Sequence, residues 1–234
     1  HFGAGKGAPL IVLHGAATAT EAETAPLIRT LASRFRTVGL DLPGHGKSAY
    51  PPASLSIRDF SDEIHDAILA LSSEPVHIVG VSMGAAIGLE ICRQQAHSVR
   101  SLTMIAPTDA WTRQRVQRMR RRLSIDRIIR NPFMVERLSV IHGDHWAELF
   151  NDLDRLIESL EGSEYAADEL RNVDTPTLIV AWDRDPLFGI EPALRLANEI
   201  PYSRLCVLPG SNHSLSSRSA WRLGAFIDDF LSEC

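Results

Sequence analysis

The sequence predicts an α/β fold with a mostly parallel sheet and helices on both of its faces, because two patterns alternate along it. Short apolar runs are typical of strands covered on both faces, and helical periodicity lies between most of them. Such alternation favours a parallel sheet. The six predicted strands occupy residues 10–14, 37–41, 76–81, 102–106, 177–182 and 205–209.

Four helices are predicted around these strands. The first follows Thr20, which has the spacing of a capping box with Glu23. The second begins at Ser56 and the third directly follows Ser82. The fourth begins at about Arg218 and carries apolar residues at helical spacing. The 234 residues fit one domain, or one domain that carries an insertion.

The alternation stops between Pro107 and Val173, where the sequence is helical but has no strand-like run. We therefore predict a core of residues 1–107 and 173–234 and a helical cap of residues 108–172. Eight arginines fall within residues 113–130, whereas acidic residues dominate 136–174. One interpretation is a set of helices that pair opposite charges. The other is a basic lip that attracts an anionic substrate or an acidic carrier protein.

Composition excludes several classes of function. The formal net charge of −5 argues against nucleic acid as a partner, and no apolar run is long enough to span a bilayer. Cys92, Cys206 and Cys234 have no metal-binding spacing, so we expect a reduced, cytoplasmic compartment. The chain begins at His1 rather than methionine, so a preceding signal peptide stays open as an alternative.

Ser82 lies in a G-x-S-x-G pattern, Gly80 to Gly84, with a predicted strand before it and a predicted helix after it. A sharp reversal at the serine would strain its backbone and crowd the neighbours two residues away, where only a small residue fits. The same turn would lift the hydroxyl above the sheet's carboxyl edge. The pattern therefore predicts an exposed nucleophile; the alternative is a serine that only caps the helix.

A serine nucleophile needs a base and an orienting carboxylate. Of the nine histidines, His213 fits best, because it follows the last predicted strand and should emerge at the same sheet edge as Ser82. Asp185 follows the fifth strand and precedes a proline, which suits a rigid turn. Asp183 in the same turn and Asp109 after the fourth strand remain alternatives.

Two backbone amides are predicted to hold the oxyanion. One belongs to Met83, directly after the nucleophile. The other is expected in the loop that follows the first predicted strand, where the sequence reads HGAA and we favour Ala16.

These motifs together resemble the α/β-hydrolase superfamily over nearly the whole chain. The resemblance rests on LIVLHG, DLPGHGKS, GVSMG, DRDPL and GSNH, in that order. It implies the α/β-hydrolase fold, the order Ser82, Asp185, His213 for the catalytic residues, and a lid at the position of the insertion. The HGAA loop departs from the HGGG form of one lipase and esterase branch. The turn with Asp185 is one residue shorter than usual, which keeps Asp183 as an alternative.

The predicted function is a serine hydrolase that cleaves carboxylic esters of small to medium, fairly apolar substrates. The alternatives are a C–C bond hydrolase, lactonase or thioesterase with the same residues, or a non-enzymatic small-ligand receptor. Gly15, Trp111, Phe133 and Trp146 are the expected substrate contacts. We expect no cofactor and no metal: DLPGHGKS has Asp41 where a phosphate-binding loop needs glycine. The sequence leaves the oligomeric state open.

Overall fold

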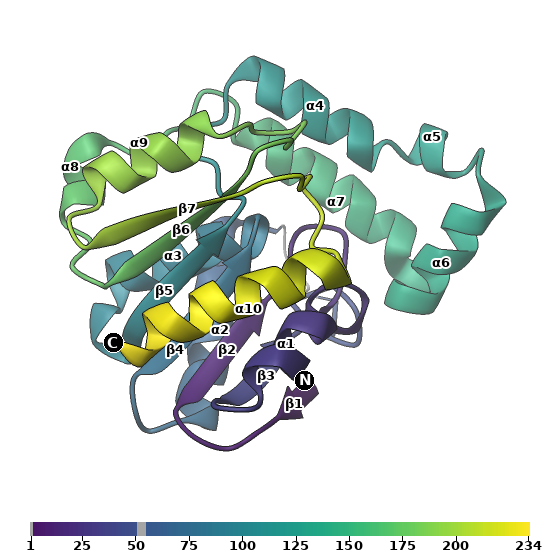
Figure 1. Ribbon diagram of the computed structural model, residues 1–234. Coiled ribbons are helices and arrows are strands. Elements are labelled where there is room, and N and C mark those ends of the chain that lie inside the picture. Colours follow the sequence, from purple (N-terminus) through teal and green to yellow (C-terminus); the bar gives the residue numbers. More distant parts are fainter. Residues whose placement is uncertain (1, 51–54) are drawn as a thin grey trace.

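The computed structural model describes residues 2–50 and 55–234, so His1 lies outside the described residues (Figure 1). Within them a seven-stranded sheet has the order β1-β3-β2-β4-β5-β6-β7, in which only the β1–β3 pair is antiparallel. The strands are β1 (Phe2–Ala4), β2 (Pro9–Leu13), β3 (Arg36–Leu40), β4 (Val76–Val81), β5 (Val99–Ile105), β6 (Thr177–Trp182) and β7 (Ser203–Leu208). The predicted α/β fold is confirmed.

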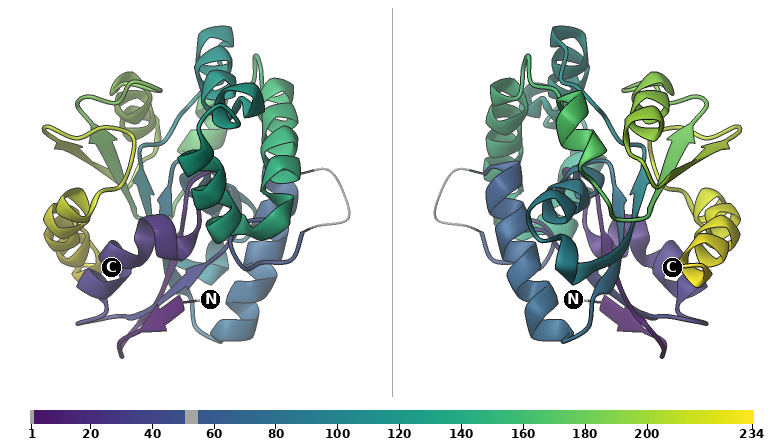
Figure 2. Two further views of the ribbon diagram at one scale, coloured as in Figure 1. Left: turned by 90° about the vertical axis from the view of Figure 1, so that its right-hand side faces the viewer. Right: turned by 90° about the vertical axis from the view of Figure 1, so that its left-hand side faces the viewer.

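Helices cover both faces of this sheet, as views from two sides show (Figure 2). One face carries α1 (Ala25–Leu31) and α10 (Ser217–Ser232), which pack on each other. The opposite face carries α2 (Ile57–Leu71), α3 (Met83–Gln94) and α9 (Glu191–Glu199). Short helical turns η1 (Thr20–Thr24) and η2 (Ala96–Ser98) precede α1 and β5.

Alternate side chains of the central strands fill two separate apolar cores. In β4, Ile78 belongs to the core beneath α2 and α3, whereas Val79 belongs to the core beneath α1 and α10; both side chains are fully buried. This two-sided burial explains why the strands are continuous apolar runs rather than alternating ones.

Three local predictions differ from the structure. Strand β1 was not predicted, because it is only three residues long and pairs antiparallel at the sheet edge. Strand β7 forms the other edge, so Leu205 and Val207 are 38% and 42% exposed rather than covered. The expected capping box is also wrong: Thr20 lies inside the π-helical turn η1, and Ala19 is the N-cap residue.

The segment between β5 and β6 lies over the carboxyl edge of the sheet and is called the cap here (Figure 1). Its helical elements are α4 (Arg113–Leu123), α5 (Ile125–Ile128), α6 (Pro132–His142), η3 (Gly143–His145), α7 (Trp146–Ser159) and α8 (Ala167–Arg171). Its two ends meet in a β-bridge between Ala110 and Glu164. None of the helices in residues 2–50 and 55–234 has both the length and the apolar composition needed to cross a membrane.

Two buried histidines make the fold sensitive to acid. Burial lowers the pKa of His14 and of His77 from 6.5 to about 4. Each histidine therefore binds its proton more tightly in the unfolded chain, so its contribution to stability is complete above pH 6.5 and is lost as the pH falls toward 4. We expect the free energy of unfolding to drop by about 3 kcal/mol for each histidine over this range.

Urea unfolding followed across this pH range measures the effect. The variant His77→Asn should show a shallower pH dependence than the unmodified chain, whereas His97→Asn, at an exposed position, should not. An unfolding midpoint that stays constant between pH 6.5 and pH 4 would contradict the expectation.

Candidate active site

Ser82 occupies a strained turn between β4 and α3. Its φ of 52° and ψ of −108° lie in a region that residues with a side chain rarely adopt. The neighbouring backbone is crowded: a Cβ on Gly80 would overlap the carbonyl of Gly84. A Cβ on Gly84 would lie 2.6 Å from the carbonyl oxygen of Leu13 in the adjacent strand. Glycine is therefore required on both sides of the serine.

The turn brings the Ser82 hydroxyl against His213. The distance from Ser82 Oγ to His213 Nε2 is 3.0 Å, and His213 Nδ1 lies 2.8 Å from Asp185 Oδ2. His213 follows β7 and Asp185 follows β6, so all three groups come from carboxyl ends of parallel strands. The structure brings together the three residues selected as nucleophile, base and acid.

The Asp185 carboxyl is held in its ionised form. Burial alone would raise its pKa, but the hydrogen bond and positive charge of His213 oppose burial and the net pKa lies below the usual value. The second oxygen, Oδ1, accepts hydrogen bonds from the amides of Leu187 at 2.8 Å and Phe188 at 3.2 Å. The carboxylate therefore has one oxygen fixed by backbone and the other directed at the histidine.

The two alternative aspartates have other partners. Asp183 is exposed and accepts the amide of Ser211 at 3.1 Å, which supports the turn before His213. Asp109 forms ion pairs with Arg115 at 2.8 Å and Arg195 at 3.1 Å. Within the described residues neither carboxylate contacts His213, which favours Asp185.

Of the three amides from Gly15 to Ala17 in the loop after β2, one is left for the site. The Gly15 amide donates to Glu23 Oε2 at 2.7 Å, and the Ala17 amide donates to His45 Nε2 at 3.3 Å. No hydrogen bond within the described residues uses the amide of Ala16, which lines a cavity with Ser82 and Met83. This arrangement supports Ala16 and Met83 as the two oxyanion donors.

Glu23 is a site residue that the sequence interpretation missed. Its carboxylate holds the Gly15 amide, and it lines a cavity with Ser82 and His213. Burial raises its pKa, and the hydrogen bond from Gly15 opposes that rise without cancelling it. The only sequence signal for it, a carboxylate three residues after Thr20, equally fits a helix cap.

Two cavities meet at Ser82. The first, called the Trp111 cavity, has a volume of about 430 Å³. Its apolar lining includes Trp111, Met119, Leu156, Leu160 and Phe188. The second, called the arginine cavity, has a volume of about 320 Å³. Its lining includes Glu23, Arg122, Met134, Arg137, Ile141 and His213. Ser82, Ala16 and Met119 line both cavities, so a substrate at the serine can extend in two directions.

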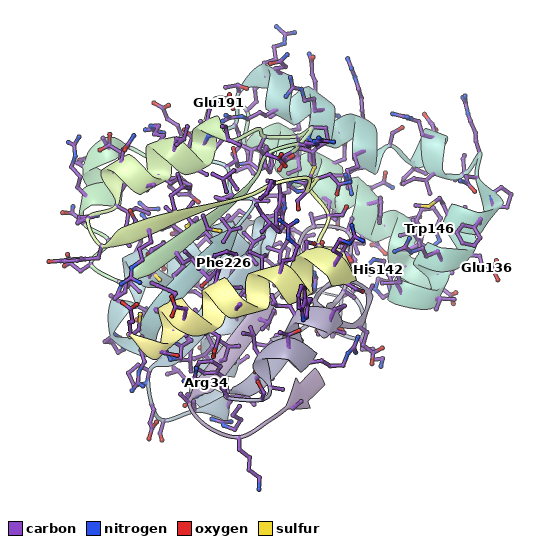
Figure 3. The ribbon with its side chains drawn as sticks, in the orientation of Figure 1. Arg34, Glu136, His142, Trp146, Glu191 and Phe226 are labelled. Atoms are coloured by element: carbon purple, nitrogen blue, oxygen red, sulfur yellow. The ribbon has the colours of Figure 1, made fainter. Side chains whose placement is uncertain are left out.

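The expected substrate contacts divide into two groups. Trp111 lines the Trp111 cavity and packs edge-on against Phe188, and Gly15 lines the arginine cavity. Phe133 and Trp146 line neither cavity, which corrects that expectation. Phe133 is 71% exposed at the start of α6, and Trp146 is buried within the cap against Phe150 (Figure 3).

The amino-acid sequence matches the α/β-hydrolase family over residues 10–221, from β2 into α10. The chain belongs to the α/β-hydrolase family. This match confirms the resemblance from which the order of the catalytic residues was inferred, and it includes every strand except β1.

Relatives within the α/β-hydrolase family act on different substrates. The (E)-2-((N-methylformamido)methylene)succinate hydrolase of Acinetobacter baylyi is 23% identical, over 92% of this chain and 87% of that protein. The 2-hydroxy-6-oxo-6-(2'-aminophenyl)hexa-2,4-dienoic acid hydrolase of Metapseudomonas resinovorans is 25% identical, over 90% of this chain and 79% of that protein. A serine hydrolase involved in carbazole degradation superposes with a TM-score of 0.81 at 25% identity, over 99% of this chain and 93% of that one. The chain is thus a hydrolase whose substrate must be inferred from its site.

Proposed function

We propose that the protein is a serine hydrolase that cleaves carboxylic esters of small to medium, fairly apolar acyl groups. The observation that carries the proposal is the continuous hydrogen-bonded series from Ser82 through His213 to Asp185, at the meeting point of two cavities. A serine hydroxyl activated by an oriented imidazole is the arrangement that acyl transfer requires.

The groups of the site divide the steps of this reaction among them. Ser82 Oγ attacks the ester carbonyl carbon while His213 Nε2 takes the hydroxyl proton, and Asp185 stabilises the imidazolium that forms. The amides of Met83 and Ala16 hold the oxyanion of the tetrahedral intermediate. As the intermediate collapses, the bond to the leaving oxygen breaks and His213 gives that oxygen its proton. Water, activated by His213, then hydrolyses the acyl-enzyme.

The Trp111 cavity supports an apolar acyl group. Its lining has aromatic and aliphatic side chains close to Ser82, and both proposed oxyanion donors line it. Five of the six charged side chains that line this cavity form ion pairs: Arg93 with Glu90 at 2.7 Å and with Glu169, Asp109 with two arginines, and Arg58 with Asp62 at 3.9 Å. The sixth, Glu164, is exposed. An acyl chain entering here would exchange water for apolar contacts, which stabilises the complex.

A fluorophosphonate probe tests the nucleophile directly. We expect one probe molecule per chain, attached to the peptide that contains Ser82 as mapped by mass spectrometry. Ser82→Ala should abolish labelling, whereas Ser33→Ala, at an exposed serine between α1 and β3, should label as the unmodified chain does. An unlabelled folded protein, or a probe attached elsewhere, would reject the proposal and favour a ligand-binding role.

A further inference from the structure

The arginine cavity contains two guanidinium groups without carboxylate partners. Arg122 comes from α4 and Arg137 from α6, and both line this cavity together with Ser82 and His213. Neither forms an ion pair within residues 2–50 and 55–234. By contrast Arg120, two residues before Arg122, pairs with both Asp154 and Glu158 on α7.

Of the eight arginines predicted to form a basic lip, only Arg115 and Arg120 form ion pairs within the described residues, and Arg122 is among the other six. Arg137 lies outside that predicted group. The Arg122 Nη2 atom lies 3.5 Å from Ser214 Oγ, directly beside His213. This contact places one guanidinium close to the proposed base. The carboxyl group in the same cavity, Glu23, already accepts the Gly15 amide. Burial raises its pKa, and the charge of Arg122 opposes that rise, but within the described residues Glu23 forms no ion pair with either arginine.

The position of His213 assigns the two cavities to the two halves of a substrate. His213 lines the arginine cavity but not the Trp111 cavity. Because His213 must give its proton to the leaving oxygen, the leaving group has to lie on the side of the imidazole. The acyl group then extends into the Trp111 cavity and the leaving group into the arginine cavity.

We propose that Arg122 and Arg137 bind a carboxylate carried by the leaving group of the substrate. The inference rests on the proposed ester hydrolysis and names the substrate class of that same site: esters of a carboxylate-bearing alcohol or phenol with an apolar acid. Guanidinium groups suit this role because their planar set of donors matches the two oxygens of a carboxylate.

Three esters, two of butyrate and one of succinate, test the acyl side and the leaving-group side of the site separately. The first is 4-nitrophenyl butyrate, which is uncharged. The second is 3-carboxy-4-nitrophenyl butyrate, with a carboxylate on the leaving group, and the third is mono-4-nitrophenyl succinate, with a carboxylate on the acyl group. For the two butyrates, kcat/KM is divided by the rate of spontaneous hydrolysis of the same ester, which removes differences in leaving-group reactivity. The succinate has the same leaving group as the first ester, so their kcat/KM values are compared directly, because its own carboxylate accelerates spontaneous hydrolysis. We expect the second ester to exceed the first about tenfold, since a charged hydrogen-bonded pair contributes a factor of this order. The third should gain nothing.

The double variant Arg122→Gln/Arg137→Gln should reduce that tenfold ratio to about one. Arg121→Gln is the matched control, because Arg121 is the neighbouring residue on α4, is exposed as Arg122 and Arg137 are, and does not line the arginine cavity. A ratio near one in the unmodified protein, or a tenfold ratio that survives the double substitution, would overturn the inference.

A binding measurement keeps the test separate from the proposed reaction. The carboxylated phenol product, 5-hydroxy-2-nitrobenzoate, is titrated calorimetrically into the unmodified protein and into the double variant. If no ester is turned over, the proposed function fails, and the arginine site is then decided by this titration alone. Binding that weakens about tenfold in the double variant supports the site, and equal or undetectable binding in both proteins overturns it.

Discussion

Replacing Ser82 by alanine should lower kcat for 4-nitrophenyl butyrate by about 10⁵- to 10⁶-fold. The hydroxyl is the only group within 3.0 Å of His213 Nε2 in the described structure that could form the acyl-enzyme. The oxyanion amides and the two cavities persist without it, so a small residual rate above spontaneous hydrolysis should remain.

A second substitution tests whether Ser82 and His213 act as one unit. Adding His213→Ala to Ser82→Ala should reduce the rate little further, although His213→Ala alone should also cost about 10⁵- to 10⁶-fold. Circular dichroism and the thermal midpoint should remain near those of the unmodified chain, because alanine relieves rather than adds crowding at the turn. The proposed mechanism would be contradicted if the fold-loss of kcat in the double variant equalled the product of the two single losses. Substantial turnover by Ser82→Ala would also contradict it.

The proximity of Ser82, His213 and Asp185 could be predicted because each residue lies at or just beyond the end of a parallel strand. Ser82 follows β4, Asp185 follows β6 and His213 follows β7. Parallel strands bring their carboxyl ends to one edge, so residues that are far apart along the chain become neighbours without any detailed knowledge of packing. The G-x-S-x-G spacing adds a local steric requirement that the crowded backbone at Gly80 and Gly84 explains.

The rest of the site depends on contacts that local patterns do not encode. Glu23 satisfies a capping-box spacing, and only its contact with Gly15 across the loop reveals another role. Phe133 and Trp146 are large aromatic residues, as substrate contacts often are. Whether they reach the cavities depends on the orientation of α6 and α7 relative to the core. In the cap, periodicity predicts helices and does not determine which of their sides meets the nucleophile.

The choice between Asp185 and Asp183 also depends on geometry, and it leads to a second large effect. Asp185→Asn should lower kcat by about 10⁴-fold. Because the amides of Leu187 and Phe188 both donate to Oδ1, the asparagine must keep its carbonyl oxygen there and turn its NH₂ group toward His213. Nδ1 of His213 then has to accept a hydrogen bond. The proton moves to Nε2, which can no longer take the proton of Ser82.

Asp183→Asn is the matched control, two residues away in the same turn. Its side chain is exposed, and an asparagine oxygen can still accept the Ser211 amide, so kcat should change by less than about threefold. The two variants should unfold at similar urea concentrations if the Asp185 effect arises from the histidine tautomer rather than from disruption of the turn. Equal losses of activity in both variants would mean that the turn as a whole, and not the single carboxylate at 2.8 Å from Nδ1, orients the base.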